Sequence, residues 1–148
     1  MRFVFFTIFL ITTLLYIWNG KDQFNKKEWL AFLVKFLLVT VGAFVWTLLL
    51  VFMVKFFPEL GYYRMRWIAV VIPQSVMAIL FCKFIVVMLY AIFTTILHLH
   101  KRHNTQENFL KVASIFTRWG PKVLIGAKCL LSIGAALAFY GIWLADAA

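Results

Sequence analysis

The sequence predicts an all-α integral membrane protein with about four transmembrane helices and one interfacial amphipathic helix. Hydrophobic residues make up 65% of the chain and its mean hydropathy is +0.95, whereas a soluble domain carries about 45–50% apolar residues. These residues also gather into long uncharged runs, and about 20 such residues cross a bilayer as a helix. We expect one polytopic membrane domain that covers residues 1–148.

The first predicted span covers residues 3–18, which carry no charge. As a helix it reaches about 24 Å, which is short for a bilayer. No pair of small residues of the kind that precedes signal-peptide cleavage stands before Asn19, so we expect the span to be retained. Tyr16 and Trp18 suit the aromatic belt at a membrane interface.

The second predicted span covers residues 30–54. Lys35 and Lys55 enclose 19 uncharged residues, which is about 28 Å of helix. Each lysine can extend its flexible stem toward an opposite interface. We therefore interpret both lysines as anchors.

The third predicted span covers residues 74–97, and Pro73 is expected to kink the entry to it. Residues 67–97 contain a single charge, Lys83. An ionisable residue inside a span is a candidate functional residue. Because every Asp and Glu lies in a linker or near an end, we expect Lys83 to lie deep in the hydrocarbon and to pair with a group that a partner supplies. The two alternatives are extension of its stem to a lipid phosphate and a lysine that is neutral.

Three histidines follow the third span, at His98, His100 and His103. They are weak candidates for ligands of a metal or haem, because two residues of separation points His98 and His100 in different directions on a helix. Positive charge near a helix C-terminus complements the helix dipole. We therefore expect no metal and no cofactor.

A short amphipathic helix is predicted over residues 104–119. Asn104 and Glu107 match the two positions of a capping box, and Gly120 with Pro121 is expected to end the helix. Its apolar residues recur at helical spacing: Phe109, Val112, Ala113, Phe116 and Trp119. This pattern predicts a helix that lies in the membrane interface, and a helix that binds a soluble partner is the alternative.

Basic residues are unevenly divided between the two sides of the predicted spans. The side with the first linker and the 98–128 region holds ten Lys and Arg residues, and the other side holds four. The positive-inside rule then places both termini on the outer side. The candidates for binding lipid headgroups are Lys101, Arg102, Lys111, Arg118, Lys122 and Lys128, with an anionic lipid such as cardiolipin as the partner. Short spans suit a bacterial or mitochondrial inner membrane.

The fourth predicted span, residues 122–144, carries a stripe of small residues on one helical face. Small residues let transmembrane helices approach closely. The stripe therefore predicts a helix-packing face, against this chain or another one. Its members are Ala127, Gly134, Ala138, Gly141 and Ala145.

The chain carries no recognisable catalytic constellation or nucleic-acid-binding motif, so we expect neither an enzyme nor a nucleic-acid partner. Cys82 and Cys129 lie in apolar runs and do not form a disulfide framework. The predicted function is a small non-catalytic accessory subunit of a larger membrane complex, with other membrane subunits as partners. The alternatives are a stand-alone protein of the immunity or exclusion type, a haem- or quinone-binding anchor, and an ion pathway through Lys83.

Overall fold

The computed structural model describes residues 2–57, 59, 61–103 and 106–145, without the side chains of residues 103, 106 and 107. The chain forms four helices: α1 (Arg2–Asn19), α2 (Lys26–Phe56), α3 (Tyr62–His103) and α4 (Gln106–Trp143). Each of the four is long and apolar enough to cross a membrane. The all-α class and the four candidate spans are therefore confirmed.

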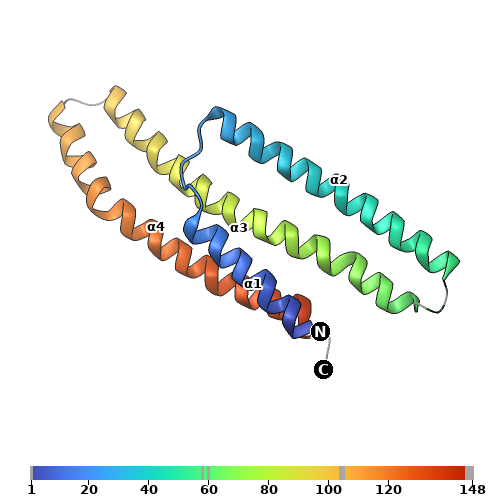
Figure 1. The fold of residues 1–148 in the computed structure, drawn as a ribbon. Coiled ribbons are helices and arrows are strands. Elements are labelled where there is room, and N and C mark those ends of the chain that lie inside the picture. Colours follow the sequence, from blue (N-terminus) through green and yellow to red (C-terminus); the bar gives the residue numbers. More distant parts are fainter. Residues whose placement is uncertain (1, 58, 60, 104–105, 146–148) are drawn as a thin grey trace.

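Helix α3 is the central element of the bundle (Figure 1). It packs against each of the other three helices, and α1 also packs against α4. In the described part of the chain, α2 contacts no helix except α3. The start of α1 and the end of α4 lie at the same end of the bundle (Figure 1).

The core of the three-helix group lies between α1, α3 and α4. On α4, Ala135, Phe139 and Trp143 recur every four residues, and all three are buried against Val71 of α3. The ring of Phe9 from α1 stacks on both Phe139 and Trp143, at centroid distances of 6.2 and 5.5 Å. Spacing of four residues places these side chains on one helical face, which explains why α4 turns this face inward.

A polar link sits inside this apolar core. Trp143 Nε1 donates a hydrogen bond to Ser75 Oγ at 3.0 Å, and Ser75 Oγ donates to the Val71 carbonyl oxygen at 2.8 Å. Because Ser75 is fully buried, these two bonds satisfy a hydroxyl that would otherwise be costly to bury. The link therefore fixes the rotation of α4 against α3.

Helix α2 begins at Lys26 because the residues before it form a capping box. The Asn25 side chain accepts a hydrogen bond from the Glu28 backbone N–H, and the Glu28 carboxylate accepts one from the Asn25 backbone N–H. This arrangement satisfies two of the backbone donors left free at a helix start. One turn later, the Phe32 ring stacks on Phe84 of α3 at 6.2 Å.

Helix α3 runs without interruption through Pro73, so the third helix begins earlier than the predicted span at residue 74. Proline has a φ value that fits a helix, and its main cost is one lost backbone hydrogen bond. Transmembrane helices tolerate this loss because neighbouring groups compensate for it. The residues before Pro73 therefore belong to the same helix as the predicted span.

The structure shows no separate interfacial helix over the described part of residues 104–119. The described part of α4 starts at Gln106 and continues through Gly120 and Pro121 into the last span. Four apolar residues of this segment are half-buried, namely Phe109, Val112, Ala113 and Phe116, and the Phe116 ring meets Phe93 of α3 at 5.9 Å. The amphipathic pattern therefore reflects packing on α3. The expected capping box of Asn104 lies outside the described residues.

We predict that Phe139→Ala destabilises the bundle. Buried Phe→Ala changes cost about 3–5 kcal/mol in soluble proteins, and we expect the lower end here because lipid is as apolar as the core. Thermal unfolding in detergent measures the loss. The matched control is Phe44→Ala on α2, whose side chain is 67% exposed. An equal loss for both variants would contradict the assigned core.

Candidate functional site

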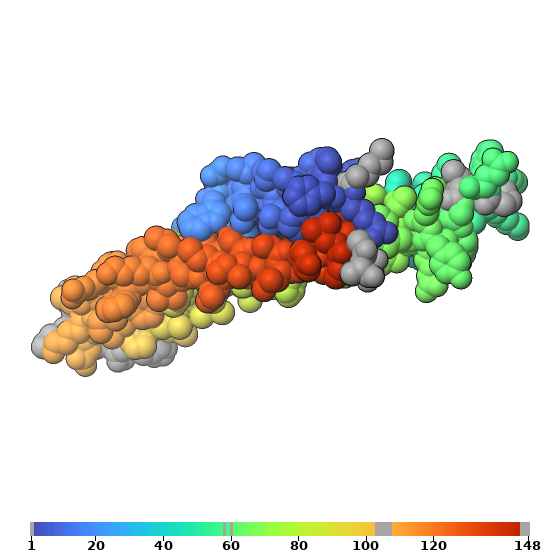
Figure 2. Space-filling view, turned by 90° about the horizontal axis from the view of Figure 1, so that it is seen from below, coloured from blue at the N-terminus to red at the C-terminus, as the bar shows by residue number. Residues whose placement is uncertain are grey.

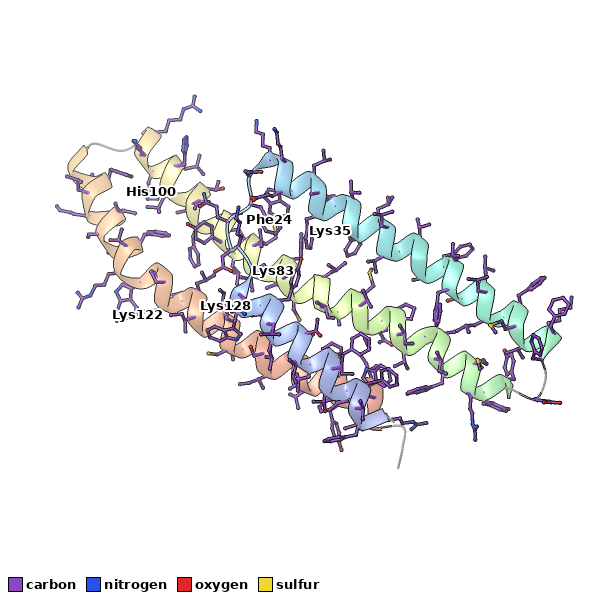
Figure 3. The ribbon with its side chains drawn as sticks, in the orientation of Figure 1. Phe24, Lys35, Lys83, His100, Lys122 and Lys128 are labelled. Carbon is purple, nitrogen blue, oxygen red and sulfur yellow. The ribbon has the colours of Figure 1, made fainter. Side chains whose placement is uncertain are left out.

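The candidate site is a buried cluster of three charges that joins the first linker to α3 and α4. Asp22 lies between two lysines. Its Oδ1 is 3.3 Å from Lys83 Nζ, and its Oδ2 is 2.6 Å from Lys128 Nζ. Lys83 is only 1% exposed and Lys128 only 7%. Figure 3 shows both lysines where the first linker leaves α1.

The position of Asp22 follows from the end of α1. That helix stops at Asn19, and the chain then turns at Gly20 close against α3. A Cβ atom on Gly20 would lie 2.8 Å from Lys83 Nζ and 2.9 Å from the Tyr16 carbonyl oxygen. Only glycine leaves room for this approach, which carries the linker over Lys83.

Aromatic rings from α1 line the cluster. Lys83 Nζ lies 6.0 Å from the Tyr16 ring centre, and Lys128 Nζ lies 5.9 Å from that of Trp18. Both distances fall at the outer limit for attraction between a cation and an aromatic ring. Trp18 Nε1 also donates a hydrogen bond to Ser132 Oγ at 3.2 Å, which ties α1 to α4 beside Lys128.

The cluster has an excess of positive charge. Two lysines and one carboxylate give it a formal charge of +1, and both lysines are removed from solvent. A buried charge is strongly unfavourable without a partner, so Asp22 is essential to both lysines. The described contacts of the cluster are two ion pairs, which join the first linker to α3 and α4.

An open polar groove of about 540 Å³ lies beside the cluster. Asp22 forms part of its wall, together with Lys21, Glu28 and Tyr90. Lys21 Nζ pairs with Glu28 Oε1 at 2.9 Å across the groove mouth. This hydrogen bond, together with the attraction between the two charges, raises the pKa of Lys21 above its usual value. The groove thus exposes the polar linker to solvent right beside the buried lysines.

The structure overturns the expectation that no carboxylate of this chain reaches Lys83. Asp22 belongs to a linker, as predicted, but α1 is short enough that its linker lies beside Lys83. Lys128, one of the candidates for headgroup binding, is buried, and its Nζ pairs with Asp22. The sequence carried one signal for this arrangement, which is the shortness of the first apolar run.

The remaining candidates for headgroup binding are all exposed. They are Lys101, Arg102, Lys111, Arg118 and Lys122. Lys122 Nζ lies 5.3 Å from the Trp119 ring centre, so that this lysine and an exposed aromatic ring share one surface. Their contact with lipid stays a prediction.

The small-residue stripe of α4 faces away from the core. Gly134, Ala138, Gly141 and Ala145 are exposed, and Ala127 is half-buried. No described atom outside the helix backbone lies within 4 Å of a Cβ built on Gly134 or Gly141. The chain packs its own helices with the adjacent face, so most of the stripe is open to lipid or to another protein.

The histidines do not form a metal site with other described side chains. No group of three or more His, Cys, Asp or Glu residues is placed to share a metal ion in the described part of the chain. His98 is exposed, and His100 Nδ1 lies 3.3 Å from the Ile96 carbonyl oxygen. The His103 side chain lies outside the described residues.

Comparison with known proteins gives no relative for this chain. No family model, no curated protein and no solved structure matches it. The function proposed below therefore rests on the residues and geometry of the chain itself.

We predict that Asp22→Asn destabilises the protein by about 3–5 kcal/mol, because it leaves two buried lysines without a counter-charge. Lys83→Met and Lys128→Met should each cost less, since Asp22 keeps one partner in either variant. Unfolding of the purified variants in detergent measures how much stability each substitution removes. Lys21→Met removes an exposed ion pair and is the control, with little effect expected. Wild-type stability for Asp22→Asn would show that the cluster does not hold the bundle together.

We predict that Gly20→Ala also destabilises the protein, because its Cβ would overlap the Tyr16 carbonyl oxygen and displace Lys83 from Asp22. Gly126→Ala is the matched control, since nothing lies within 4 Å of a Cβ there. Alanine favours a helix over glycine by about 1 kcal/mol, so this control should be neutral or stabilising. Melting temperatures of the two variants test the difference, and a Gly20→Ala protein as stable as wild type would refute the close approach.

Proposed function

We propose that this chain is a non-catalytic accessory subunit of a larger membrane protein complex. The observation that carries the proposal is a two-helix arm, made of residues 91–103 of α3 and 106–120 of α4. The arm extends past the end of α1 and the start of α2, as the yellow and orange segments show in Figures 1 and 2. Its α3 part is about 20 Å long.

The charges of the four helices support a membrane boundary at the base of this arm. Each helix has an uncharged stretch of similar length between two charged residues. These stretches hold 18 residues between Arg2 and Lys21, 19 between Lys35 and Lys55, 16 between Arg66 and Lys83, and 17 between Lys128 and Asp146. Such lengths correspond to about 24–28 Å of helix, close to the hydrocarbon thickness of a thin bilayer.

The polar linker favours the same boundary. Lys21, Gln23 and Asn25 are exposed beside the Asp22 cluster, and backbone outside a helix avoids lipid-exposed positions in the hydrocarbon. We infer that Lys83 and Lys128 lie near this boundary and that the third span covers about residues 67–82. With this boundary, the arm lies outside the hydrocarbon layer of the membrane.

The surface of the arm combines apolar and basic side chains. Large apolar residues are more than half exposed there: Leu99, Leu110, Ile115 and Trp119. Four Lys and Arg residues lie among them: Lys101, Arg102, Lys111 and Arg118. Exposed apolar patches outside the hydrocarbon are typical of sites that bind another protein or a membrane surface. This surface supports docking to other membrane subunits, with anionic lipid such as cardiolipin as a further contact.

The orientation of the chain forms part of this proposal. With Lys83 at the linker boundary, that side of the membrane carries eleven Lys and Arg residues (the ten counted from the sequence plus Lys83), against four on the other side. The positive-inside rule favours the arm on the inner side and both termini on the outer side of a bacterial or mitochondrial inner membrane.

We predict that a photo-cross-linking amino acid at Leu110 or Ile115 forms protein adducts in the native membrane, because both positions are exposed on the arm. Electrophoresis followed by mass spectrometry would show the adducts and identify the partner. The control position is Leu33 of α2, which is 57% exposed. At Leu33 we expect fewer protein adducts. If neither arm position gives more protein adducts than Leu33, the arm is not a subunit contact.

A further inference from the structure

An apolar groove lies between α3 and α4 at the opposite end of the bundle from the arm. Its volume is about 640 Å³, within the about 300–1,000 Å³ that small-molecule sites occupy. The α3 side is lined by Tyr63, Arg66, Trp67, Val70, Val71 and Gln74. The α4 side is lined by Leu137, Ala138, Gly141 and Ile142.

The groove is open, and small residues form part of its α4 side. Ala138 and Gly141 add little side-chain volume to the α4 side of the groove. A Cβ on Gly141 would meet nothing within 4 Å. Val70 and Leu137 also line the groove, with 55% and 68% of their surface exposed. The open stripe of α4 therefore forms part of one side of the groove.

Positive charge is concentrated at one end of the groove. Arg66 lines the groove itself, and the Arg2 guanidinium carbon lies 4.7 Å from the ring centre of Trp67, which also lines it. None of the described residues that line the groove is acidic. The α3 side of the groove extends about 12 Å along the helix, from Arg66 to Gln74. Arg66 lies at the end of the uncharged stretch of α3, and Gln74 lies near the middle of the proposed span.

We propose that this groove binds one anionic phospholipid of the outer leaflet. The phosphate accepts hydrogen bonds from the Arg66 guanidinium, whose planar donors match phosphate geometry. One acyl chain lies along Val70, Leu137 and Ala138, toward Gln74. The lipid thereby fills the space that the small residues leave open on the surface of α4.

The groove favours a lipid over a second transmembrane helix. Close helix packing needs small residues where two backbones approach, but this groove is also lined by the larger side chains of Val70 and Leu137, which are more than half exposed. A helix with its side chains is about 10–12 Å across. An unbranched acyl chain is much narrower and fits beside Val70 and Leu137. A charged end next to an apolar channel also matches the division of a phospholipid into headgroup and chain.

Native mass spectrometry of the detergent-solubilised full chain tests the proposal. The protein is titrated with phosphatidylglycerol or with phosphatidylcholine of the same acyl chains. We expect one phosphatidylglycerol to bind at least about tenfold more tightly than phosphatidylcholine, and to raise the melting temperature. Inorganic phosphate at the same concentration should give no such rise, because it lacks the chain.

Two pairs of variants locate the site. Arg66→Gln should weaken phosphatidylglycerol binding about tenfold, and the control Arg64→Gln, at an exposed residue outside the groove, should not. Gly141→Leu should block the groove and abolish the single tight site, and the control Gly126→Leu, at an open position on the same helix, should leave it intact. Melting temperatures without lipid show whether each variant is folded.

Two results would overturn the proposal. Equal binding of the two lipids by wild type, Arg66→Gln and Arg64→Gln would show that no headgroup is recognised at Arg66. Unchanged lipid binding by Gly141→Leu, together with a change in its oligomeric state or loss of a co-purifying subunit, would assign the groove to a partner helix.

Discussion

The contact that the rest of the structure depends on is the carboxylate of Asp22 between two buried ammonium groups. Lys83 comes from α3 and Lys128 from α4, so one side chain of the first linker holds three chain segments that lie 61 and 106 residues apart. The Lys128 contact, at 2.6 Å, is the shorter of the two. Because neither lysine can recover its hydration inside the bundle, losing Asp22 removes the counter-charge of both at once.

The length of α1 decides where this contact can form. At 18 residues it is the shortest of the four helices, and its last turn ends beside the middle of α3. Helices α3 and α4 continue well beyond that point, where they pack against each other (Figure 1). A short first helix therefore produces both features of the fold: a buried cluster where the polar linker meets the bundle, and an arm that extends past it.

The sequence was sufficient to predict the four helices as candidate spans, because long apolar runs are local signals. The Asp22 cluster could not be predicted in this way. The sequence placed Asp22 in a polar linker and Lys83 in an apolar run, and only the tertiary packing of α1 against α3 and α4 brings them together. The error at Gly120 and Pro121 has a similar origin, since packing on α3 sustains α4 where local signals predict a helix end.

On α4 the sequence shows a stripe of small residues, but it does not determine what packs against that stripe. Small residues do form one stripe, and the adjacent face with Ala135, Phe139 and Trp143 forms the core. Packing needs large side chains that interlock as well as small ones that allow approach. Phe139 and Trp143 supply the contact area against α1 and α3, so the core selects their face. The small residues are left on the outer surface, where a groove with an arginine at its end remains open.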